Sequence, residues 1–371
     1  MSKRTILLAA LLVLFGMALA SRSASAQDVV TNGKAETRVA TPQAASPVFV
    51  QFGIAGKPTS LAIENTGRVW VTLPDINAIG VISVTEATSQ TVTAYITHTI
   101  SLAPGSQPYD LAFHAGEVWF TAYGGNSIGR LDPLTDSIQN YPIPETDSGP
   151  TGIAIATDGM VWFAQRTANR ISQLDPVSGA FQSYLYTRPD AGLDEVVTVQ
   201  PDSIWFTAPN VNRIVNFDPT KDLFNSIPTL PYTRPVGLAV EPGDEPWVSV
   251  TGGNAVGRYA PGTLAFWRWT PLPTGSESGF GPQRIALTAG GAPWNLFYAN
   301  GPAQNIGRVF VGADTATGGI RQLPAPSAAC TPLDVATDGD GNAWFTCGAA
   351  NTVVLWRSPF SLDVFAPVVA R

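Results

Sequence analysis

The chain has 371 residues, of which 44% are hydrophobic and 13% are charged, and it contains 35 glycines and 31 prolines. This composition provides apolar surface for a large core and residues for many tight turns. The formal net charge of −7, without any cluster of Lys and Arg, argues against nucleic acid or an anionic membrane as a partner, since both attract positive surfaces.

The first residues have the layout of a secretory signal peptide. Lys3 and Arg4 precede an apolar run over residues 6–20, and small residues follow up to Ala26. We therefore expect a signal peptide over residues 1–26, cleaved before Gln27, and a secreted, periplasmic or extracellular protein. The run is short for a membrane span, so we expect no span after cleavage; an uncleaved anchor is the alternative. The mature chain would hold 18 Lys and Arg against 28 Asp and Glu, a net charge of −10.

A repeat of 42 to 50 residues fills most of the chain. Its markers are a tryptophan, a proline about twelve residues before it and an asparagine about seven residues after it. The tryptophans are Trp70, Trp119, Trp162, Trp205, Trp247, Trp294 and Trp344. Two units deviate: the fourth has its proline upstream at Pro189, and the sixth has its asparagine delayed to Asn305, which indicates an insertion of four residues.

Each unit predicts four strands. In the third unit, β-forming runs over residues 152–156, 161–164, 170–175 and 180–184 are separated by turns that contain Gly, Asp, Asn or Pro. This pattern indicates an antiparallel meander, and seven meanders can bury their faces when they are arranged radially. The sequence therefore predicts an all-β fold, a seven-bladed β-propeller of four-stranded antiparallel blades, with the repeated tryptophans in the core between blades.

The propeller is expected over residues 47–371. Residues 27–46 are polar and poor in aromatic residues, and we expect a flexible lead-in there. Residues 48–52 have the pattern of an outer strand without a blade of its own, and they could complete the seventh blade. Residues 360–369 are the alternative, and the sequence does not choose between the two.

The two cysteines fall in the last unit. Cys330 precedes its first strand and Cys347 ends its second strand, nearly symmetrically about the turn at residues 338–342. Pairing of these strands should bring the thiols together, and an exported protein favours their oxidation. We expect a disulfide between them; two buried thiols are the alternative.

The repeat resembles that of the streptogramin B (virginiamycin B) lyases and, more widely, of NHL-like propellers. The clearest stretch is residues 108–144, with VWFT at 118–121 and NSIGRL at 126–131. The resemblance implies an Mg²⁺-assisted elimination that opens a cyclic depsipeptide, with a histidine as general base. It also implies that the functional residues lie at one mouth of the central channel, next to the repeat prolines.

The lyase residues implied by this resemblance are not matched. A tyrosine in the first blade, a histidine in the sixth and Glu-Pro-His in the seventh are replaced by Thr59, Gln283 and the TPL of residues 331–333. The histidines of the chain are His98, near an outer strand, and His114, which should lie on the rim opposite the mouth. We therefore expect no catalytic residue, no metal and no other cofactor; Mg²⁺ would bind only if the lyase chemistry survives.

The residues that follow the repeat prolines should form the mouth of the channel and contact any ligand. In the fourth blade Asp190 or Asp194 fits, depending on where an insertion falls, and we assign Asp194. The expected ring is Thr59, Tyr109, Thr151, Asp194, Val236, Gln283 and Leu333. Asp110 and Asp334 should lie one residue deeper, which leaves the mouth largely neutral.

These observations favour a secreted or periplasmic monomer that is a non-catalytic binding module. Its mouth would take a small molecule, a peptide, a glycan or a protein partner. A divergent carbon–oxygen lyase or hydrolase with relocated chemistry is the first alternative. A structural propeller of the cell envelope is the second.

Overall fold

The computed structural model describes residues 36–39, 49–64, 67–87, 92–260, 266–273, 281–288, 294–311 and 317–357. The expected signal peptide and the C-terminal candidate strand at 360–369 lie outside the described residues. Among the helices of the described part, none is long and apolar enough to cross a membrane.

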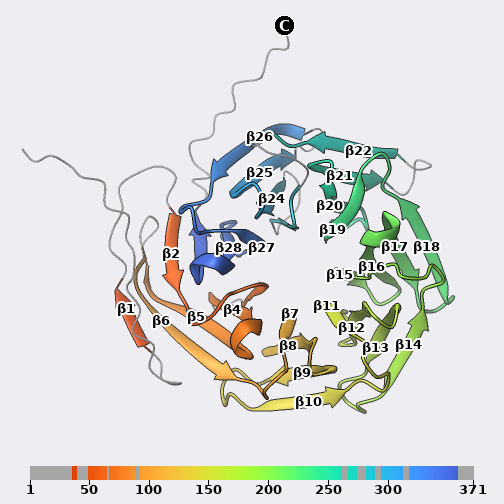
Figure 1. Ribbon diagram of the computed structural model, residues 1–371, viewed down its shortest axis with the longest axis horizontal. Helices are drawn as coiled ribbons and strands as arrows, with labels where there is room; N and C mark the ends of the chain where they lie inside the picture. The colour runs from red at the N-terminus through yellow and green to blue at the C-terminus, as the bar shows by residue number, and fades with distance from the viewer. Residues whose placement is uncertain are drawn as a thin grey trace, which may run out of the picture.

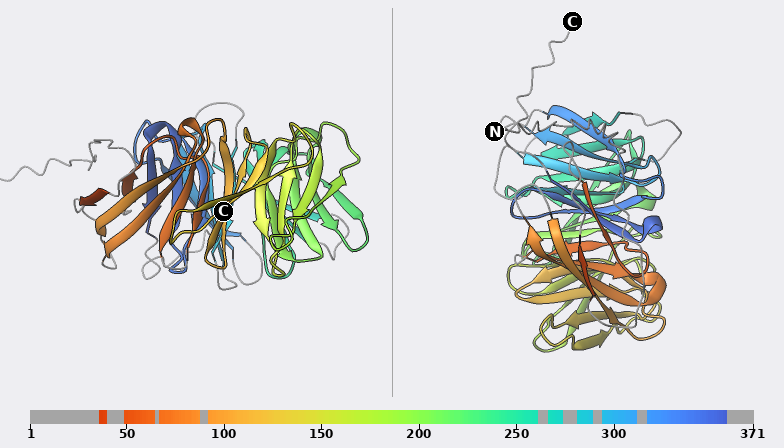
Figure 2. Two further views of the ribbon diagram at one scale, coloured as in Figure 1. Left: turned by 90° about the horizontal axis from the view of Figure 1, so that it is seen from below. Right: turned by 90° about the vertical axis from the view of Figure 1, so that its left-hand side faces the viewer.

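Seven antiparallel sheets stand around a central channel (Figure 1), and together they form a flat, wide ring (Figure 2). Blade 1 contains β3 (Leu61–Ile63), β4 (Arg68–Leu73), β5 (Ala78–Ala87) and β6 (Val92–Ser101). Blade 2 contains β7 (Pro108–His114), β8 (Glu117–Ala122), β9 (Ser127–Leu131) and β10 (Ile138–Pro142). Blade 3 contains β11 (Pro150–Ile155), β12 (Val161–Gln165), β13 (Arg170–Leu174) and β14 (Phe181–Leu185). Blade 4 contains β15 (Val196–Gln200), β16 (Ser203–Ala208), β17 (Arg213–Asp218) and β18 (Leu223–Pro228).

The remaining blades repeat this order, with the first strand next to the channel and the fourth outermost. Blade 5 contains β19 (Thr233–Val240), β20 (Pro246–Gly252), β21 (Ala255–Ala260) and β22 (Phe266–Pro271). Blade 6 contains β23 (Arg284–Leu287), β24 (Trp294–Asn300), β25 (Asn305–Val311) and β26 (Thr317–Pro324). Blade 7 contains β27 (Pro332–Thr337), β28 (Ala343–Cys347), β29 (Thr352–Trp356) and β2 (Phe49–Gly53). The predicted fold, a seven-bladed propeller of four-stranded blades, is confirmed.

The N-terminal strand closes the ring. β2 pairs antiparallel with β29, with Phe49 opposite Trp356 and Gly53 opposite Thr352, and it forms the outer edge of blade 7. Of the two closures that the sequence leaves open, the structure therefore adopts the N-terminal one. A further strand, β1 (Glu36–Val39), lies within the segment expected as a lead-in and pairs with β6 as a fifth strand of blade 1.

The core lies between neighbouring blades. In blade 1, Trp70 projects from β4 into a cluster with Leu111 and Val118 of blade 2. Seven clusters of this kind surround the channel, and each contains one ring from the same position of a second strand: Trp70, Trp119, Trp162, Trp205, Trp247, Phe297 and Trp344. Six of the repeated tryptophans are therefore core residues between blades.

In blade 6 the ring belongs to Phe297, and the expectation that Trp294 is the equivalent residue is wrong. Phe297 pairs with Ala286 of the first strand, which is the pairing that the tryptophans make in the other blades. Trp294 pairs instead with Val311, at the far end of β24. The extra residues of this unit lie in the hairpin between β23 and β24, before the aromatic position.

The turn between the second and third strands requires a residue with left-handed backbone. Its φ lies between 47° and 55° at Asn77, Asn126, Asn169, Asn212, Asn254 and Asn351. Asparagine adopts this conformation more readily than most residues, which explains the repeat. In blade 6 Gln304 has this conformation, with φ 49°, and it lies seven residues after Phe297. The expected insertion of four residues between the aromatic residue and Asn305 is therefore also wrong.

The asparagine side chain ties this turn to the loop that enters the next blade. Asn126 Oδ1 accepts the backbone N–H of Ser148 at 2.8 Å, and its Nδ2 donates to the carbonyl of Glu145 at 2.8 Å. Asn169 makes the same pair of contacts with Ala191 N–H and the Arg188 carbonyl. These bonds order the loops on the face of the ring that carries the mouth.

The predicted disulfide is confirmed. Cys330 and Cys347 are bonded, with their Cα atoms 4.7 Å apart, and both are fully buried. Pro332, two residues after Cys330, is paired with Cys347 across β27 and β28. The bond therefore joins the entry loop of blade 7 to the end of its second strand.

Candidate functional site at the channel mouth

A bulge in the first strand shapes the mouth in four blades. In blade 2 the pairing with the second strand shifts between Pro108 and Leu111, and the same shift occurs in blades 3, 5 and 7. The two residues inside it, Tyr109 and Asp110, have no opposite partner on β8. A bulge re-aims the side chains of its extra residues, and here it brings them to the channel.

In five blades a hydroxyl of the second strand accepts the backbone N–H of the second residue after the proline site. Thr121 Oγ1 accepts the N–H of Asp110 at 3.1 Å, and Thr72 Oγ1 accepts that of Ser60 at 2.9 Å. The same contact, at 2.9 to 3.0 Å, is made in blades 4, 5 and 7 by Thr207, Ser249 and Thr346. Because a buried donor without a partner is costly, this bond explains the recurring Thr or Ser two residues after the tryptophan.

A cavity of about 530 Å³ opens at the mouth. Its walls are Thr59, Ser60, Pro74, Asp75, Gln107, Pro108, Tyr109, Tyr123, Asp194, Val236, Gln283, Arg284 and Leu333. Of the seven residues expected to form the mouth ring, all except Thr151 are among them. Thr151 is fully buried, and its Oγ1 donates to the carbonyl of Leu193 at 3.0 Å.

The position of blade 4 in this ring is now defined. Val197 pairs with Trp205, as Ala112 pairs with Trp119 in blade 2. Three residues before Val197 is Asp194, and three residues before Ala112 is Tyr109. Asp194 is therefore the blade 4 equivalent of Tyr109, and Asp194, not Asp190, lies at the mouth.

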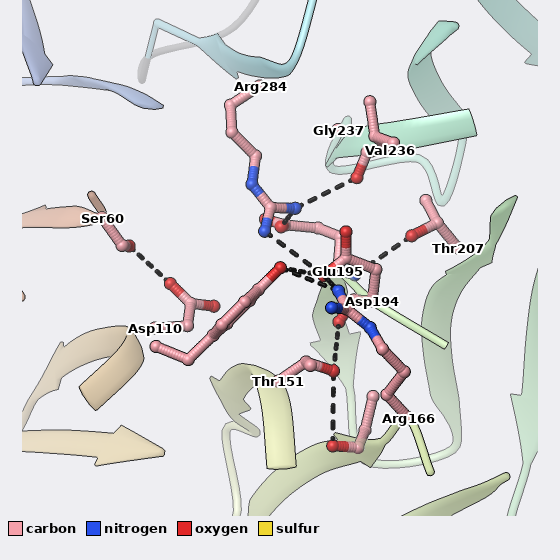
Figure 3. A network of polar contacts seen from close by, with 12 residues as sticks. Ser60, Asp110, Thr151, Arg166, Asp194, Glu195, Thr207, Val236, Gly237 and Arg284 are labelled. Carbon is pink, nitrogen blue, oxygen red and sulfur yellow. Dashed lines mark hydrogen bonds and ion pairs between the residues drawn. The ribbon is translucent and has the colours of Figure 1, made fainter. Parts of the chain in front are cut away.

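Arg166 and Asp194, both labelled in Figure 3, form a closed polar cluster with Tyr109. Arg166 Nη2 donates to Asp194 Oδ1 at 2.7 Å and to the Tyr109 hydroxyl at 2.8 Å, and that hydroxyl donates to Asp194 Oδ1 at 2.8 Å. The Arg166 guanidinium also lies over the Tyr109 ring, 5.1 Å from its centroid. Burial, reinforced by the Asp194 charge, raises the pKa of Tyr109, so its phenol stays protonated.

A second ion pair lies on the floor of the cavity. Arg284 Nη1 contacts Glu195 Oε2 and donates to the Val236 carbonyl at 3.0 Å, and Arg284 Nη2 lies 3.6 Å from Asp194 Oδ1. The Arg284 side chain is 15% exposed. Burial disfavours its charge, but Asp194 and the other acidic groups around it outweigh this and raise the pKa of Arg284. Arg284 is therefore a permanent cation at the centre of the mouth.

The expectation of a largely neutral mouth is therefore wrong. Arg284 and Glu195 occupy the second position after the proline site in their blades, the same position as Asp110 and Asp334. A count of that position along the repeat would have identified both. Arg166 lies in the turn after β12, outside the repeat proline region, and no signal in the sequence points from it to Asp194.

Asp110 and Asp334 join neighbouring blades below the mouth. Asp110 Oδ2 accepts the N–H of Ile153 in blade 3 at 3.1 Å, and Asp334 Oδ2 accepts that of Leu61 in blade 1 at 2.8 Å. Ser60 Oγ lies between them, 2.6 Å from Asp110 Oδ1 and 2.9 Å from Asp334 Oδ2. Burial raises the pKa of both carboxyls, that of Asp334 to about 6.

Both histidines lie away from the cavity. His98 belongs to the outer strand β6 and its Nε2 lies 2.8 Å from Asp136 Oδ2, in the turn between β9 and β10. His114 ends β7, with two residues between it and the start of β8, at the other end of the strand from the mouth. Neither is among the residues that line the cavity.

The residues at the mouth do not fit the divalent cation that the family resemblance implies. Asp194 already accepts from Arg166 and Tyr109, and Glu195 is paired with Arg284. Within the described ranges, no group of three or more His, Cys, Asp or Glu side chains is placed to hold a metal ion. The guanidinium of Arg284 supplies the positive charge that these carboxylates require.

The fold and the site define a class: a seven-bladed propeller with a cavity of ligand-binding size at one mouth of its channel. The virginiamycin B lyase family model matches residues 49–265, more than half of the chain, and the chain belongs to this family. No curated protein has a significantly similar sequence.

Solved structures share the fold at low sequence identity. The virginiamycin B lyase from Staphylococcus aureus is 22% identical, with a TM-score of 0.71 over 84% of this chain and 99% of that one. A streptogramin B lyase is 23% identical, with a TM-score of 0.69 over 83% of this chain and 96% of that one. The hydrazine synthase of Kuenenia stuttgartiensis is 13% identical, with a TM-score of 0.63 over 82% and 96%.

Proposed function

We propose that this protein is an exported, non-catalytic member of its family that binds a ligand in the cavity at the mouth. The observation that carries the proposal is the position of the two histidines: both lie away from the cavity, and Gln283 occupies the ring position where the lyase resemblance calls for a histidine. The disulfide supports the exported location, because such bonds persist in oxidising compartments.

The chemistry of the cavity supports binding without elimination. Elimination requires a base that accepts a proton near neutral pH and a group that stabilises the developing negative charge. The amide of Gln283 accepts no proton at neutral pH, and the Tyr109 phenol stays protonated. Asp194 and Glu195 are held in ion pairs with arginines. Binding of a macrocycle in such a cavity would lower no chemical barrier.

The walls indicate a ligand of no net charge with at least one flat ring. Tyr123 is 36% exposed and stands beside Tyr109, whose ring centroid is 6.1 Å away, so one tyrosine face is free for stacking. Val236 and Leu333 supply apolar contacts in the same cavity, and Gln283 supplies an amide. The charged groups of the floor are already paired with one another, so they have little to gain from an ionic ligand. Peptides with aromatic side chains and glycans both meet this description.

A thermal-shift screen of the mature protein tests the binding proposal. Cell-wall peptides, glycans and macrocyclic esters are added in turn, and a true ligand raises the Tm in a concentration-dependent manner. Tyr123→Ala and Gln283→Ala should reduce the shift, whereas Val177→Ala, on the exposed turn after β13, should leave it unchanged. A ligand whose shift is the same in all three variants would show that the mouth is not its site.

A turnover assay tests the absence of lyase activity. The purified protein is incubated with a streptogramin B antibiotic and Mg²⁺, and ring opening is followed by mass spectrometry. We expect no opening above a control without protein. Turnover that Gln283→Ala abolishes would contradict the proposal and place a catalytic function at the mouth.

A further inference from the structure

One serine hydroxyl lies between a buried carboxyl group, that of Asp110, and a partly buried one, that of Asp334, under the floor of the mouth. Ser60 Oγ is 2.6 Å from Asp110 Oδ1 and 2.9 Å from Asp334 Oδ2, both within hydrogen-bond distance. Ser60 is 7% exposed and Asp110 9%, so water does not compete freely for these contacts. A hydroxyl has a single proton and can donate to only one of the two. If both carboxyls were ionised, two oxygen lone pairs would face each other at one of these contacts.

The other partners of the two carboxyls do not remove this conflict. Asp334 accepts the backbone N–H groups of Leu61 and Val335, each at 2.8 Å. Asp110 accepts those of Leu111 at 2.9 Å and Ile153 at 3.1 Å. Two of them, the N–H groups of Leu61 and Leu111, bond to the same oxygens that face Ser60, but none supplies a proton between Ser60 Oγ and a carboxyl oxygen.

We propose that Asp110, Ser60 and Asp334 form a proton-binding site, in which the two carboxyls share one proton below neutral pH. The proton resides on Asp334 Oδ2 and is donated to Ser60 Oγ, and the Ser60 hydroxyl donates in turn to the ionised Asp110. The shorter contact, from Ser60 Oγ to Asp110 Oδ1, is then the one with the charged acceptor, as is usual for charge-assisted hydrogen bonds. In this arrangement one proton lies in each of the two contacts, Asp334 to Ser60 and Ser60 to Asp110.

The surroundings of both carboxyls favour the shared proton. Burial raises the pKa of Asp334, and the neighbouring charge of Asp110 raises it further, whereas Arg284 lowers it; the result is about 6. Burial also raises the pKa of Asp110, against Arg284 and the bond from Ser60. Arg284 of β23 is the cation that acts on both carboxyls, and it is shared with Asp194 and Tyr109. On the side of β11, Asp110 meets the backbone N–H of Ile153.

Loss of the proton would change the mouth itself. Ser60 lines the cavity and belongs to blade 1, while Asp334 and Asp110 belong to the blades on either side of it. With both carboxyls ionised, Ser60 can bond to only one neighbour, and the seam toward the other blade loses a contact. This consequence for ligand affinity rests on the proposed function, but the proton site does not.

Infrared titration of the full-length mature protein tests the proposal directly. A protonated carboxyl has a C=O stretching band that ionised carboxylates lack, and the band should persist to about pH 6, well above the value of an ordinary Asp. Asp334→Asn should remove it. Asp110→Asn should move its midpoint to lower pH, because the neighbouring negative charge is gone. Asp147→Asn, an exposed residue with left-handed backbone that Asn tolerates, is the control.

Thermal unfolding as a function of pH gives a second readout. A carboxyl with a higher pKa in the folded state stabilises the fold while protonated, and this contribution is lost as the pH rises through the folded value. The Tm of the wild type should therefore fall, relative to Asp334→Asn, between about pH 4 and about pH 6, and change little above that. The variant also loses the acceptor for Leu61 N–H, but that loss is the same at every pH.

Three results would overturn the proposal. One is the absence of any protonated carboxyl band above about pH 5 in the wild type. Another is a band that remains, with the same midpoint, in Asp334→Asn. The third is a Tm difference between wild type and Asp334→Asn that does not change with pH. If Asp334→Asn does not fold, the wild-type band and its shift in Asp110→Asn still decide the matter. A ligand screen without hits would leave this proposal intact.

Discussion

Replacement of Arg284 by methionine should cost more stability than removal of its partner. Arg284 is 15% exposed, and it is held by Glu195, the Val236 carbonyl and, at 3.6 Å, Asp194. In Arg284→Met, Asp194 keeps Arg166 and Tyr109 as partners, but Glu195 loses its cation. Breaking a buried ion pair in this way costs about 3–5 kcal/mol, and because Glu195 is 19% exposed we expect the lower end, about 3 kcal/mol.

A double-mutant cycle isolates the pair. Glu195→Gln should cost only about 1 kcal/mol, since Arg284 keeps the Val236 carbonyl and Asp194 as partners. The double variant Glu195→Gln/Arg284→Met removes both charges and should lose about 2 kcal/mol, less than the sum of the single changes. The free energies come from urea unfolding, with Arg188→Met on an exposed loop as the control. A double variant whose loss equals that sum would show that the two side chains are not coupled, and the reasoning would fail.

Three further predictions concern the scaffold. Replacement of both Cys330 and Cys347 by serine should lower the free energy of unfolding by about 3 kcal/mol, measured in urea with and without reductant. Phe297→Ala, which empties a fully buried position between blades 6 and 7, should cost about 3–5 kcal/mol; a loss below about 1 kcal/mol would contradict its assignment to the tryptophan position. Gly307→Ala places a Cβ 2.0 Å from Tyr298 Cζ and should lower the Tm, whereas an unchanged Tm would show that the Tyr298 ring moves freely.

The fold was predictable because each marker of the repeat has a separate structural task. The tryptophan fills the space between blades, the proline begins the strand next to the channel, and the asparagine turns the chain. Blade 6 does not match the pattern, because Phe297 stands at the tryptophan position and Gln304 at the asparagine position. The consecutive Gly307 and Arg308 correspond to Gly129 and Arg130 in blade 2, and this match indicates the correct register.

The site was predictable only in part. The first residue after the proline site reaches the mouth in most blades, since the bulge repeats and carries its side chain with it. The ionic contacts depend on which side chains of neighbouring blades meet at the mouth. Arg166 of blade 3 meets Tyr109 of blade 2 and Asp194 of blade 4, and the repeat alone does not specify such lateral pairings.

The closure by β2 determines the order in which the ring can be completed. The strand that finishes blade 7 lies about 300 residues before its partner β29, so it leaves the ribosome first and finds its place last. Until β29 exists, β2 lacks its pairing partner, and the ring of blades is open. A contact that spans so much of the chain is slow to form, because the intervening loop must be closed first. Once formed, it joins the two ends of the propeller, and unravelling from either end must begin by breaking this one seam.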